Sequence, residues 1–207
     1  MKKIIYAFAL LLVSSVSLVA CAQSKESKKE NNMEESRKVL VAYFSRTGEN
    51  YGVGNITTGN TQIVAEMIAQ ETGGDMFKIE PVESYPDSYD ACVELAKKEQ
   101  EAKARSAVKG DVMVKNYDVI FIGYPNWWGD MPMPVYTFIE KHNWQGKTVV
   151  PFCTHEGSGL GSTVSKLQSA CGGAKVLKGL AIYGHTAQND RKEAQKVTLK
   201  WLKTLQY

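Results

Sequence analysis

Residues 39–61 read VLVAYFSRTGENYGVGNITTGNT, and this stretch gives the clearest indication of the fold class. Its first part, Val39 to Ser45, is a nearly unbroken apolar run, which predicts a β-strand buried on both faces. Its last residue opens a helical pattern that runs from Thr61 to Glu71 and ends at two glycines. A buried strand followed by an amphipathic helix is the building unit of a parallel α/β sheet.

The same alternation of strand and helix continues to the end of the chain. Further strands are predicted at Met76 to Pro81, Val119 to Tyr124, Thr148 to Thr154 and Val176 to Tyr183. Further helices are predicted at Ser88 to Ala104, Val135 to Lys141, Leu160 to Cys171 and Glu193 to Leu205. Five strands joined by helices require right-handed crossovers, which place helices on both faces of a five-stranded parallel sheet. No internal repeat or second boundary is visible, so we expect one domain over residues 38–207.

The N-terminus has a different character. Two lysines followed by the apolar run Ile4 to Val13 predict a secretory signal peptide over residues 1–20. The order Leu18-Val19-Ala20-Cys21 resembles the bacterial lipobox, which implies a lipidated Cys21 and a membrane-anchored protein of the bacterial cell envelope. The alternative is cleavage after Ala20 or Ala22, with Cys21 incidental. Residues 21–37 are polar and charged, which predicts a flexible tether.

The overall composition is that of a globular protein. The 207 residues include 25 Lys and Arg against 22 Asp and Glu, for a net charge of +3, and 43% are hydrophobic. This balance excludes a disordered chain, a collagen-like repeat and a polytopic membrane protein. Without the signal peptide the side-chain charge falls to about +1, so the chain shows no basic footprint for nucleic acid.

The cysteines and histidines do not form a metal or disulfide pattern. The cysteines other than Cys21 are Cys92, Cys153 and Cys171. Their number is odd and no C-x-x-C occurs, so each is expected to be a buried apolar residue. The histidines are His142, His155 and His185. They lack the spacing of metal ligands, so no metal site is predicted.

Three loops follow predicted strands at the edge where α/β sheets bind ligands. The first, residues 45–61, places several hydroxyl groups before a helix start, where backbone N–H groups and the helix dipole favour an anion. It matches neither a P-loop nor a Rossmann dinucleotide site. We therefore predict a phosphomonoester held by neutral donors. The alternative is an ordinary loop in which Thr58 or Asn60 caps the helix.

The second and third loops supply surfaces for the rest of a ligand. Residues 124–134 read YPNWWGDMPMP. This rigid aromatic loop suits a flat, π-rich ligand, or alternatively a protein partner. Residues 154–162 read THEGSGLGS, and their glycines let the backbone approach a ligand edge. The alternative for this loop is a turn in which Ser158 or Ser162 caps the next helix.

Together these motifs resemble the flavodoxin-like proteins, which bind FMN on a three-layer sandwich with strand order 2-1-3-4-5. Tyr43 to Gly48 and Gly59 to Thr61 are similar to that family's S-x-T-G-N-T phosphate loop. The resemblance implies that the FMN phosphate is bound by Ser45, Thr47, Asn60 and Thr61. It implies that the isoalloxazine is flanked by Pro125, Asn126, Trp127, Trp128 and Gly129. It implies that the pyrimidine edge faces Thr154, His155, Gly157 and Gly159.

Two features depart from that family. Residues 49–59 are inserted into the phosphate motif, so either Gly48 or Gly59 takes the place of the motif glycine. Flavodoxins that carry electrons between proteins are strongly acidic, whereas this chain is nearly neutral. The resemblance therefore favours small-molecule reductases at least as much as protein-to-protein electron carriers.

These observations predict an FMN flavoprotein of the envelope. It would transfer electrons or reduce a small quinone-like acceptor, with His155 as a proton donor. The electron donor and acceptor are unidentified, and the oligomeric state is open. One alternative is direct oxidation of NADH or NADPH. Another is a surface-tethered binding protein on a flavodoxin scaffold, without redox turnover.

Overall fold

The computed structural model describes residues 37–207. The predicted signal peptide, the lipidated Cys21 and the tether up to residue 36 lie outside the described residues. Within residues 37–207, no helix has both the length and the apolar character needed to cross a membrane.

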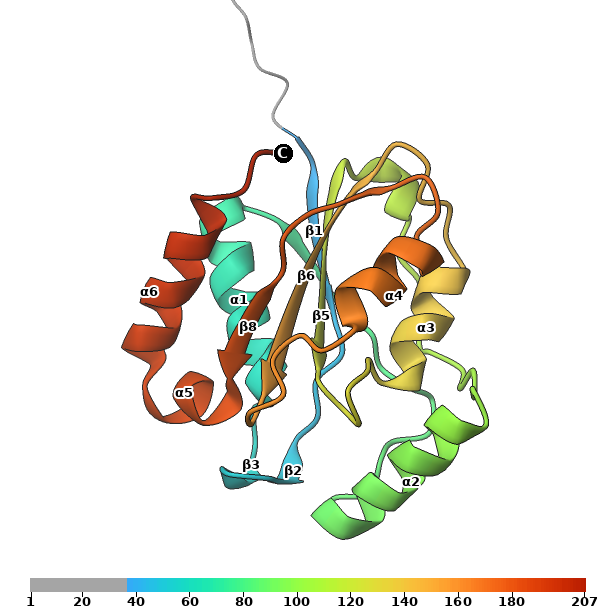
Figure 1. Cartoon of the computed structure of the whole chain (residues 1–207), viewed down its shortest axis with the longest axis vertical. Coiled ribbons are helices and arrows are strands. Elements are labelled where there is room, and N and C mark those ends of the chain that lie inside the picture. The colour runs from blue at the N-terminus through green and yellow to red at the C-terminus, as the bar shows by residue number, and fades with distance from the viewer. Residues whose placement is uncertain (1–36) are drawn as a thin grey trace, which may run out of the picture. The chain divides into compact units, whose positions relative to one another are not determined.

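The centre of the domain is a parallel β-sheet (Figure 1). Its strands are β1 (Val39–Tyr43), β4 (Asp75–Lys78), β5 (Val119–Pro125), β6 (Thr148–His155), β7 (Lys175–Val176) and β8 (Leu180–Tyr183). The order is β4-β1-β5-β6-β7, and β8 also pairs with β6. Because β7 and β8 together take the fifth position, the predicted order 2-1-3-4-5 is confirmed.

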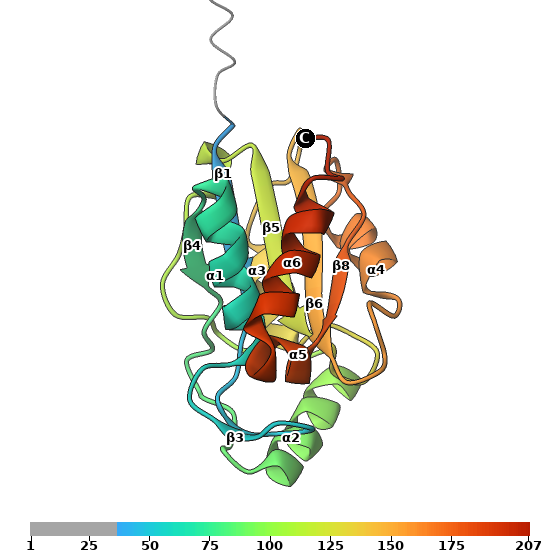
Figure 2. The same cartoon turned by 90° about the vertical axis from the view of Figure 1, so that its left-hand side faces the viewer.

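Helices cover both faces of the sheet (Figures 1 and 2). The helices are α1 (Asn60–Thr72), α2 (Tyr89–Glu101), α3 (Met133–Glu140), α4 (Thr163–Ala170), α5 (Gly184–Asn189) and α6 (Arg191–Leu202), with a 3-10 turn at Val114–Asn116. Helix α2 covers neither face and lies beyond the carboxyl ends of the strands. Helices α1, α5 and α6 lie on one face, and α3 and α4 lie on the other. The three-layer sandwich is therefore confirmed.

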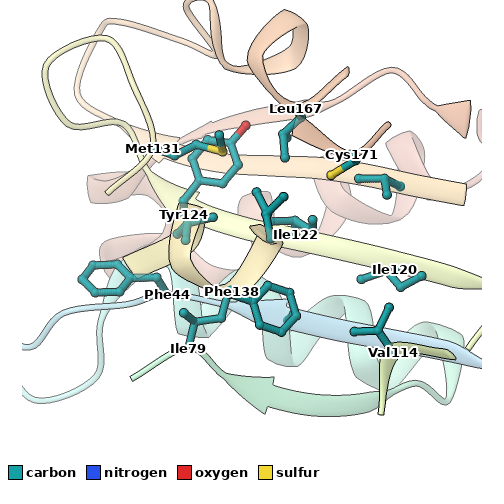
Figure 3. Close-up of a cluster of buried hydrophobic side chains, with 14 of the residues drawn as sticks. Phe44, Ile79, Val114, Ile120, Ile122, Tyr124, Met131, Phe138, Leu167 and Cys171 are labelled. Atoms are coloured by element: carbon teal, nitrogen blue, oxygen red, sulfur yellow. The ribbon is translucent and has the colours of Figure 1, made fainter. Parts of the chain in front are cut away.

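Each face of the sheet has its own apolar core. On β1, Val39, Val41 and Tyr43 join the cluster under α1 and α6, whereas Leu40 and Ala42 join the opposite cluster. Figure 3 shows part of the second cluster, including side chains from β5, α3 and α4. Period-2 alternation with both faces buried explains the continuous apolar runs in the sequence. The three cysteines of the described chain are free and buried, as expected.

The fifth strand is interrupted, so the prediction of one strand from Val176 to Tyr183 is wrong. Along β6, Val149 pairs with Val176 and Phe152 pairs with Leu180, which leaves one extra residue on the edge strand. The N–H of Leu177 donates to the carbonyl of Val149 at 2.9 Å. The next donor on that side of β6 would be Pro151, which has no N–H, so the ladder breaks there.

Other boundaries also differ from the sequence prediction. The first strand ends at Tyr43, and the inserted residues form an antiparallel hairpin of β2 (Gly48–Asn50) and β3 (Gly54–Ile56). The helix predicted to begin at Leu160 is α4, and it begins at Thr163. Leu160 belongs to a preceding turn, in which its carbonyl accepts the N–H of Thr163. The last helix, α6, begins at Arg191 rather than Glu193 because the side chain of Asp190 caps it, and the short helix α5 before it was not predicted.

Candidate functional site

The loop after β1 delivers Ser45 to the start of α1. The Oγ of Ser45 accepts the N–H of Gln62 at 3.0 Å, so Ser45 satisfies one of the free N–H groups of the first turn. This Oγ keeps its own proton, which remains available to an anion. Neither Thr58 nor Asn60 caps the helix: the cap position is Gly59, and no side chain bonds from it.

A buried pair of hydroxyl groups joins the first and third loops. The Oγ1 atoms of Thr61 and Thr154 lie 2.8 Å apart, although the two residues are 93 positions apart in the chain. Both side chains are almost fully buried. Only one of the two hydroxyls donates in this contact, so the other proton is free for a further acceptor. Thr47, by contrast, is exposed.

Gly59, rather than Gly48, lies beside Ser45. A Cβ on Gly59 would come within 2.2 Å of the Ser45 Oγ and 2.5 Å of the Arg46 carbonyl, so only glycine fits there. Gly48 instead lies against Asp87, before α2. The insertion therefore separates the two halves of the motif in sequence but not in space.

Arg46 fastens the hairpin to the start of α2. Its guanidinium donates to the carbonyls of Pro86 at 2.6 Å and Asp87 at 2.7 Å, and also to that of Glu49. The Glu49 carboxylate accepts the N–H of Tyr89 at 3.0 Å, in the first turn of α2. With its donors used on carbonyl groups, Arg46 acts as a structural clamp, and sequence reasoning did not identify it.

The loop after β5 forms a tight turn at the tip. The backbones of Trp127 and Asp130 bond each other at 2.9 and 3.0 Å. The two residues between them have positive φ, 54° at Trp128 and 75° at Gly129, as in a type I′ turn. Positive φ is strained for a tryptophan, and strain of this kind concentrates at functional sites.

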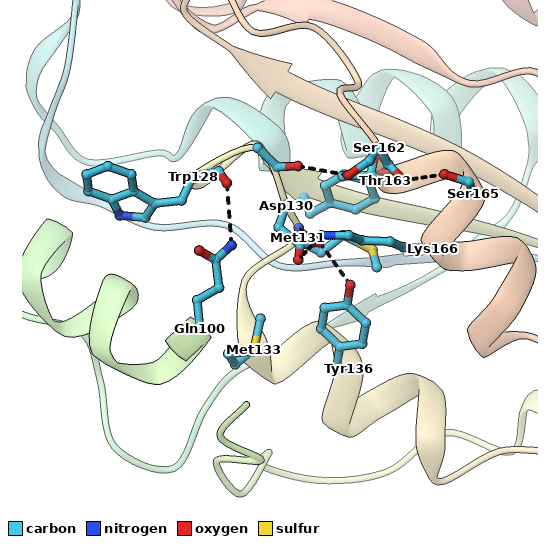
Figure 4. Close-up of polar contacts among 12 residues, drawn as sticks. Gln100, Trp128, Asp130, Met131, Met133, Tyr136, Ser162, Thr163, Ser165 and Lys166 are labelled. Carbon is cyan, nitrogen blue, oxygen red and sulfur yellow. Dashed lines mark hydrogen bonds and ion pairs between the residues drawn. The ribbon is translucent and has the colours of Figure 1, made fainter. Parts of the chain in front are cut away.

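Asp130 anchors this turn to helices α3 and α4 (Figure 4). It is 6% exposed and accepts the N–H of Met131 at 2.7 Å and the hydroxyl of Tyr136 at 2.9 Å. Lys166 of α4 completes the set as an ion pair. Burial and the Asp130 contact raise the pKa of Tyr136, so its hydroxyl stays a donor. The strained turn is therefore held by groups that sequence reasoning did not identify.

The two tryptophans have different environments. Trp127 packs edge-on against Phe44 at 5.3 Å and Tyr85 at 5.0 Å between ring centroids. Trp128 is 54% exposed, and its indole N–H approaches the carbonyl of Val93 on α2. A cavity of about 260 Å³ lies between this loop, α2 and the hairpin, and is lined by both tryptophans and Asn126.

The loop after β6 contacts the loop after β5. The side-chain N–H of Asn126 donates to the carbonyl of Gly159 at 2.7 Å. The N–H of Gly157 donates to Nδ1 of His155 at 2.9 Å, so the ring proton of a neutral His155 lies on Nε2. Burial lowers the pKa of His155 below its ordinary value, which favours the neutral form. His155 is thus a neutral hydrogen-bond donor.

A fourth segment, after β8, adjoins the first and third predicted loops. Glu156 contacts His185 at the start of α5, and Gln188 of α5 donates to the carbonyl of Thr58 at 2.5 Å. Gly184 lies directly against the side chain of Asn60. The His-Glu adjacency in the third loop was visible in sequence, but its partner His185 was not. Within residues 37–207, no group of three or more potential ligands forms a metal site.

The donor set fits a phosphorylated, planar ligand such as FMN. Ser45, Thr61 and the first N–H groups of α1 provide neutral donors for a phosphate. Four buried polar atoms have no partner within the described chain, and two of them, the acceptors Oδ1 of Asn60 and Oδ1 of Asn126, lie at these loops. Buried polar atoms are usually paired, so these two are positions where donor groups of a ligand, such as hydroxyl or ring N–H groups, would be accepted.

Comparison with known proteins agrees with this geometry. The sequence pattern of the flavodoxin family matches residues 38–198. A provisionally assigned flavoprotein from Bacteroides eggerthii is 32% identical, with a TM-score of 0.64 over 81% of this chain and 97% of that chain. One from Bacteroides uniformis is 29% identical, with a TM-score of 0.64 over 81% and 99%.

A more distant structure shares the fold alone. It is a flavoprotein from Lactobacillus acidophilus in complex with FMN, 21% identical, with a TM-score of 0.56 over 74% of this chain and 97% of that chain. No curated protein matches the sequence. The family pattern spans most of the described residues and agrees with the strand order and the loop motifs, and the chain therefore belongs to the flavodoxin family.

Proposed function

We propose that residues 38–207 bind FMN and act as an electron-transfer flavoprotein, with a small quinone-like compound as the electron acceptor. The observation that carries this proposal is the convergence of three loops, with buried acceptor atoms of Asn60 and Asn126 left for a ligand. Bound FMN supplies the redox chemistry, while the protein binds and orients it.

The phosphate end is assigned to the loop after β1. Ser45 and the Thr61–Thr154 pair each retain a hydroxyl proton for a phosphate oxygen. The N-terminus of α1 adds a favourable dipole for the negative charge. No lysine is needed, because several neutral donors together with the dipole stabilise a compact phosphate.

The ring end is assigned to the loops after β5 and β6. Trp128 offers an exposed aromatic face, and its strained turn is held in place by Asp130. His155 donates from Nε2 as a neutral imidazole, either to the pyrimidine edge or to a bound acceptor. Trp127 stiffens the loop through its contacts with Phe44 and Tyr85.

The small net charge favours a small acceptor over a protein partner. Electrostatic steering between electron-transfer proteins needs complementary fields, and a chain near neutrality lacks a strong one. The N-terminal sequence pattern supports a location in the bacterial cell envelope, where lipid on Cys21 would tether the domain to a membrane.

Absorption spectroscopy tests the proposal. The purified protein is expected to show a flavin spectrum, or to acquire one when it is titrated with FMN at micromolar concentration. Reduced protein is then mixed with a naphthoquinone under anaerobic conditions, and reoxidation of the flavin is followed. Failure to take up FMN would refute the proposal and favour a binding protein without redox turnover. FMN uptake without reoxidation would refute only the small acceptor.

The same sample also tests whether the protein oxidises NADH or NADPH directly. Anaerobic mixing of the oxidised, FMN-loaded protein with NADH or NADPH is expected to bleach the flavin slowly, if at all. Rapid bleaching by either nicotinamide would show that the protein is itself an NAD(P)H-dependent reductase.

A further inference from the structure

Glu156 and His185 form a tight carboxylate–imidazole pair at the edge of the site. The Oε2 of Glu156 lies 2.6 Å from Nδ1 of His185, and its Oε1 accepts the backbone N–H of His185 at 2.8 Å. Both carboxylate oxygens therefore bind the same residue. This arrangement fixes the imidazole with Nδ1 toward the carboxylate and leaves Nε2 for other partners.

The surroundings enclose the Glu156 side of this pair. The Glu156 side chain is 18% exposed, while the His185 ring is 49% exposed. A Cβ on Gly184 would come within 2.7 Å of the Glu156 Oε1, and one on Gly52 of the hairpin within 3.1 Å of its carboxyl carbon. Glu156 is thus enclosed by α5 and the hairpin, and His185 keeps access to solvent.

The pair is continuous with the predicted pyrimidine edge. The His155 ring packs on Tyr183 at 4.5 Å, and Tyr183 packs on His185 at 4.9 Å between ring centroids. The ionisable neighbours in contact with the pair are therefore His155 and Tyr183, from β6 and β8. The neutral Asn60 approaches from α1 through Gly184.

The charge of this pair depends on one proton. With a neutral imidazole the pair carries a net charge of −1, and with an imidazolium it carries zero. Imidazole is the side chain whose ordinary titration falls between pH 5 and 8. A negative charge arising next to the pair favours the imidazolium, because the net charge of the pair then falls to zero.

We propose that the Glu156–His185 pair takes up one proton when bound FMN is reduced, which balances the negative charge that reduction places at the pyrimidine edge. The proton comes from solvent and binds Nε2 of His185, while the Nδ1 proton stays on His185 and is donated to the Glu156 carboxylate. The electrons come from the external reductant. The inference rests on the proposed function, and it makes His185 a tuning residue and Glu156 its positioning residue.

Spectroelectrochemistry of the FMN-loaded full chain tests this. The slope of the midpoint potential against pH gives the number of protons taken up per two electrons. Between pH 5 and 8 we expect the wild type to take up as much as one proton per flavin more than His185→Gln. The control is His142→Gln, just after α3 on the other face of the sheet, which should match the wild type. Equal slopes for the wild type and His185→Gln would overturn the inference.

Nitrogen NMR of the apo protein tests the pair without FMN. In the wild type the neutral His185 ring is expected to carry its proton on Nδ1, and Glu156→Gln should shift the ring toward the Nε2 tautomer. A wild-type ring already protonated on Nε2 would contradict the geometry. If FMN does not bind at all, the proposed function fails with the inference. If FMN binds but the proton count is unchanged in His185→Gln, only the inference fails.

Discussion

Gly184 is the position where one added methyl group should disrupt the site most selectively. It lies at the start of α5, directly against the phosphate loop. A Cβ at this position would lie 2.2 Å from Nδ2 of Asn60 and 2.7 Å from Oε1 of Glu156. Contacts between non-bonded heavy atoms are favourable only near about 3.5 Å. Gly184→Ala therefore forces the Asn60 amide to move by about 1 Å or more.

The expected effect falls on FMN binding more than on stability. The Asn60 amide is the end of a side chain and can rotate away, so we expect a stability loss of about 1 kcal/mol, the low end for overpacking. The Nδ2 donor that the motif assigns to the FMN phosphate is then displaced. A hydrogen bond from this N–H to the charged phosphate contributes about 1.5–3 kcal/mol, so the Kd for FMN should rise at least about tenfold.

The assay is a titration of apo protein with FMN, followed by quenching of the flavin fluorescence, together with urea denaturation. Gly172→Ala is the matched control, because a Cβ at Gly172 meets no atom within 4 Å. The control should bind FMN with the wild-type Kd. If Gly184→Ala also bound FMN like the wild type, α5 would not adjoin the phosphate site, and the assignment of Asn60 would be wrong.

Three further predictions test other parts of the site. Trp128→Ala removes the exposed indole, so the Kd for FMN should rise about tenfold, measured by the same titration, with little change in the urea midpoint. Thr61→Val leaves the hydroxyl of Thr154 buried without its partner, so unfolding in urea should show a loss of about 1–3 kcal/mol. The double variant with Thr154→Val should lose less than the sum of the single variants, and additive losses would show that the contact contributes nothing. Because burial lowers the pKa of His155 in the folded state, the unfolded chain binds the proton more readily, and stability should fall as pH drops below about 6.5. His155→Gln should make the urea midpoint less dependent on pH between 8 and 5, and an unchanged dependence would contradict this assignment.

Local patterns in the sequence were sufficient to predict the sheet. The apolar runs at β1, β5 and β6 follow from burial on both faces, and helical periodicity located the helices between them. The edge strand was predicted wrongly because its break depends on Pro151 of the neighbouring strand. A missing donor on one strand leaves no pattern in the sequence of the other.

The candidate site was predictable where it follows a known motif, even one that an insertion splits. Ser45 and Asn60 were placed by the phosphate motif, and the structure brings them to one helix start although a hairpin separates them. The hairpin and its clamp Arg46 were not predicted. Three-residue strands give too short an alternation to recognise, and carbonyl acceptors have no sequence signature.

From the sequence we could predict the α/β class, the loops that carry the candidate site and, through the family resemblance, the strand order. Which side chains meet across those loops depends on the tertiary structure. Thr61 pairs with Thr154 over 93 positions, and Glu156 pairs with His185 over 29. Secondary structure follows from local periodicity, whereas these pairs depend on strand order and on crossovers that bring distant strand ends to one edge.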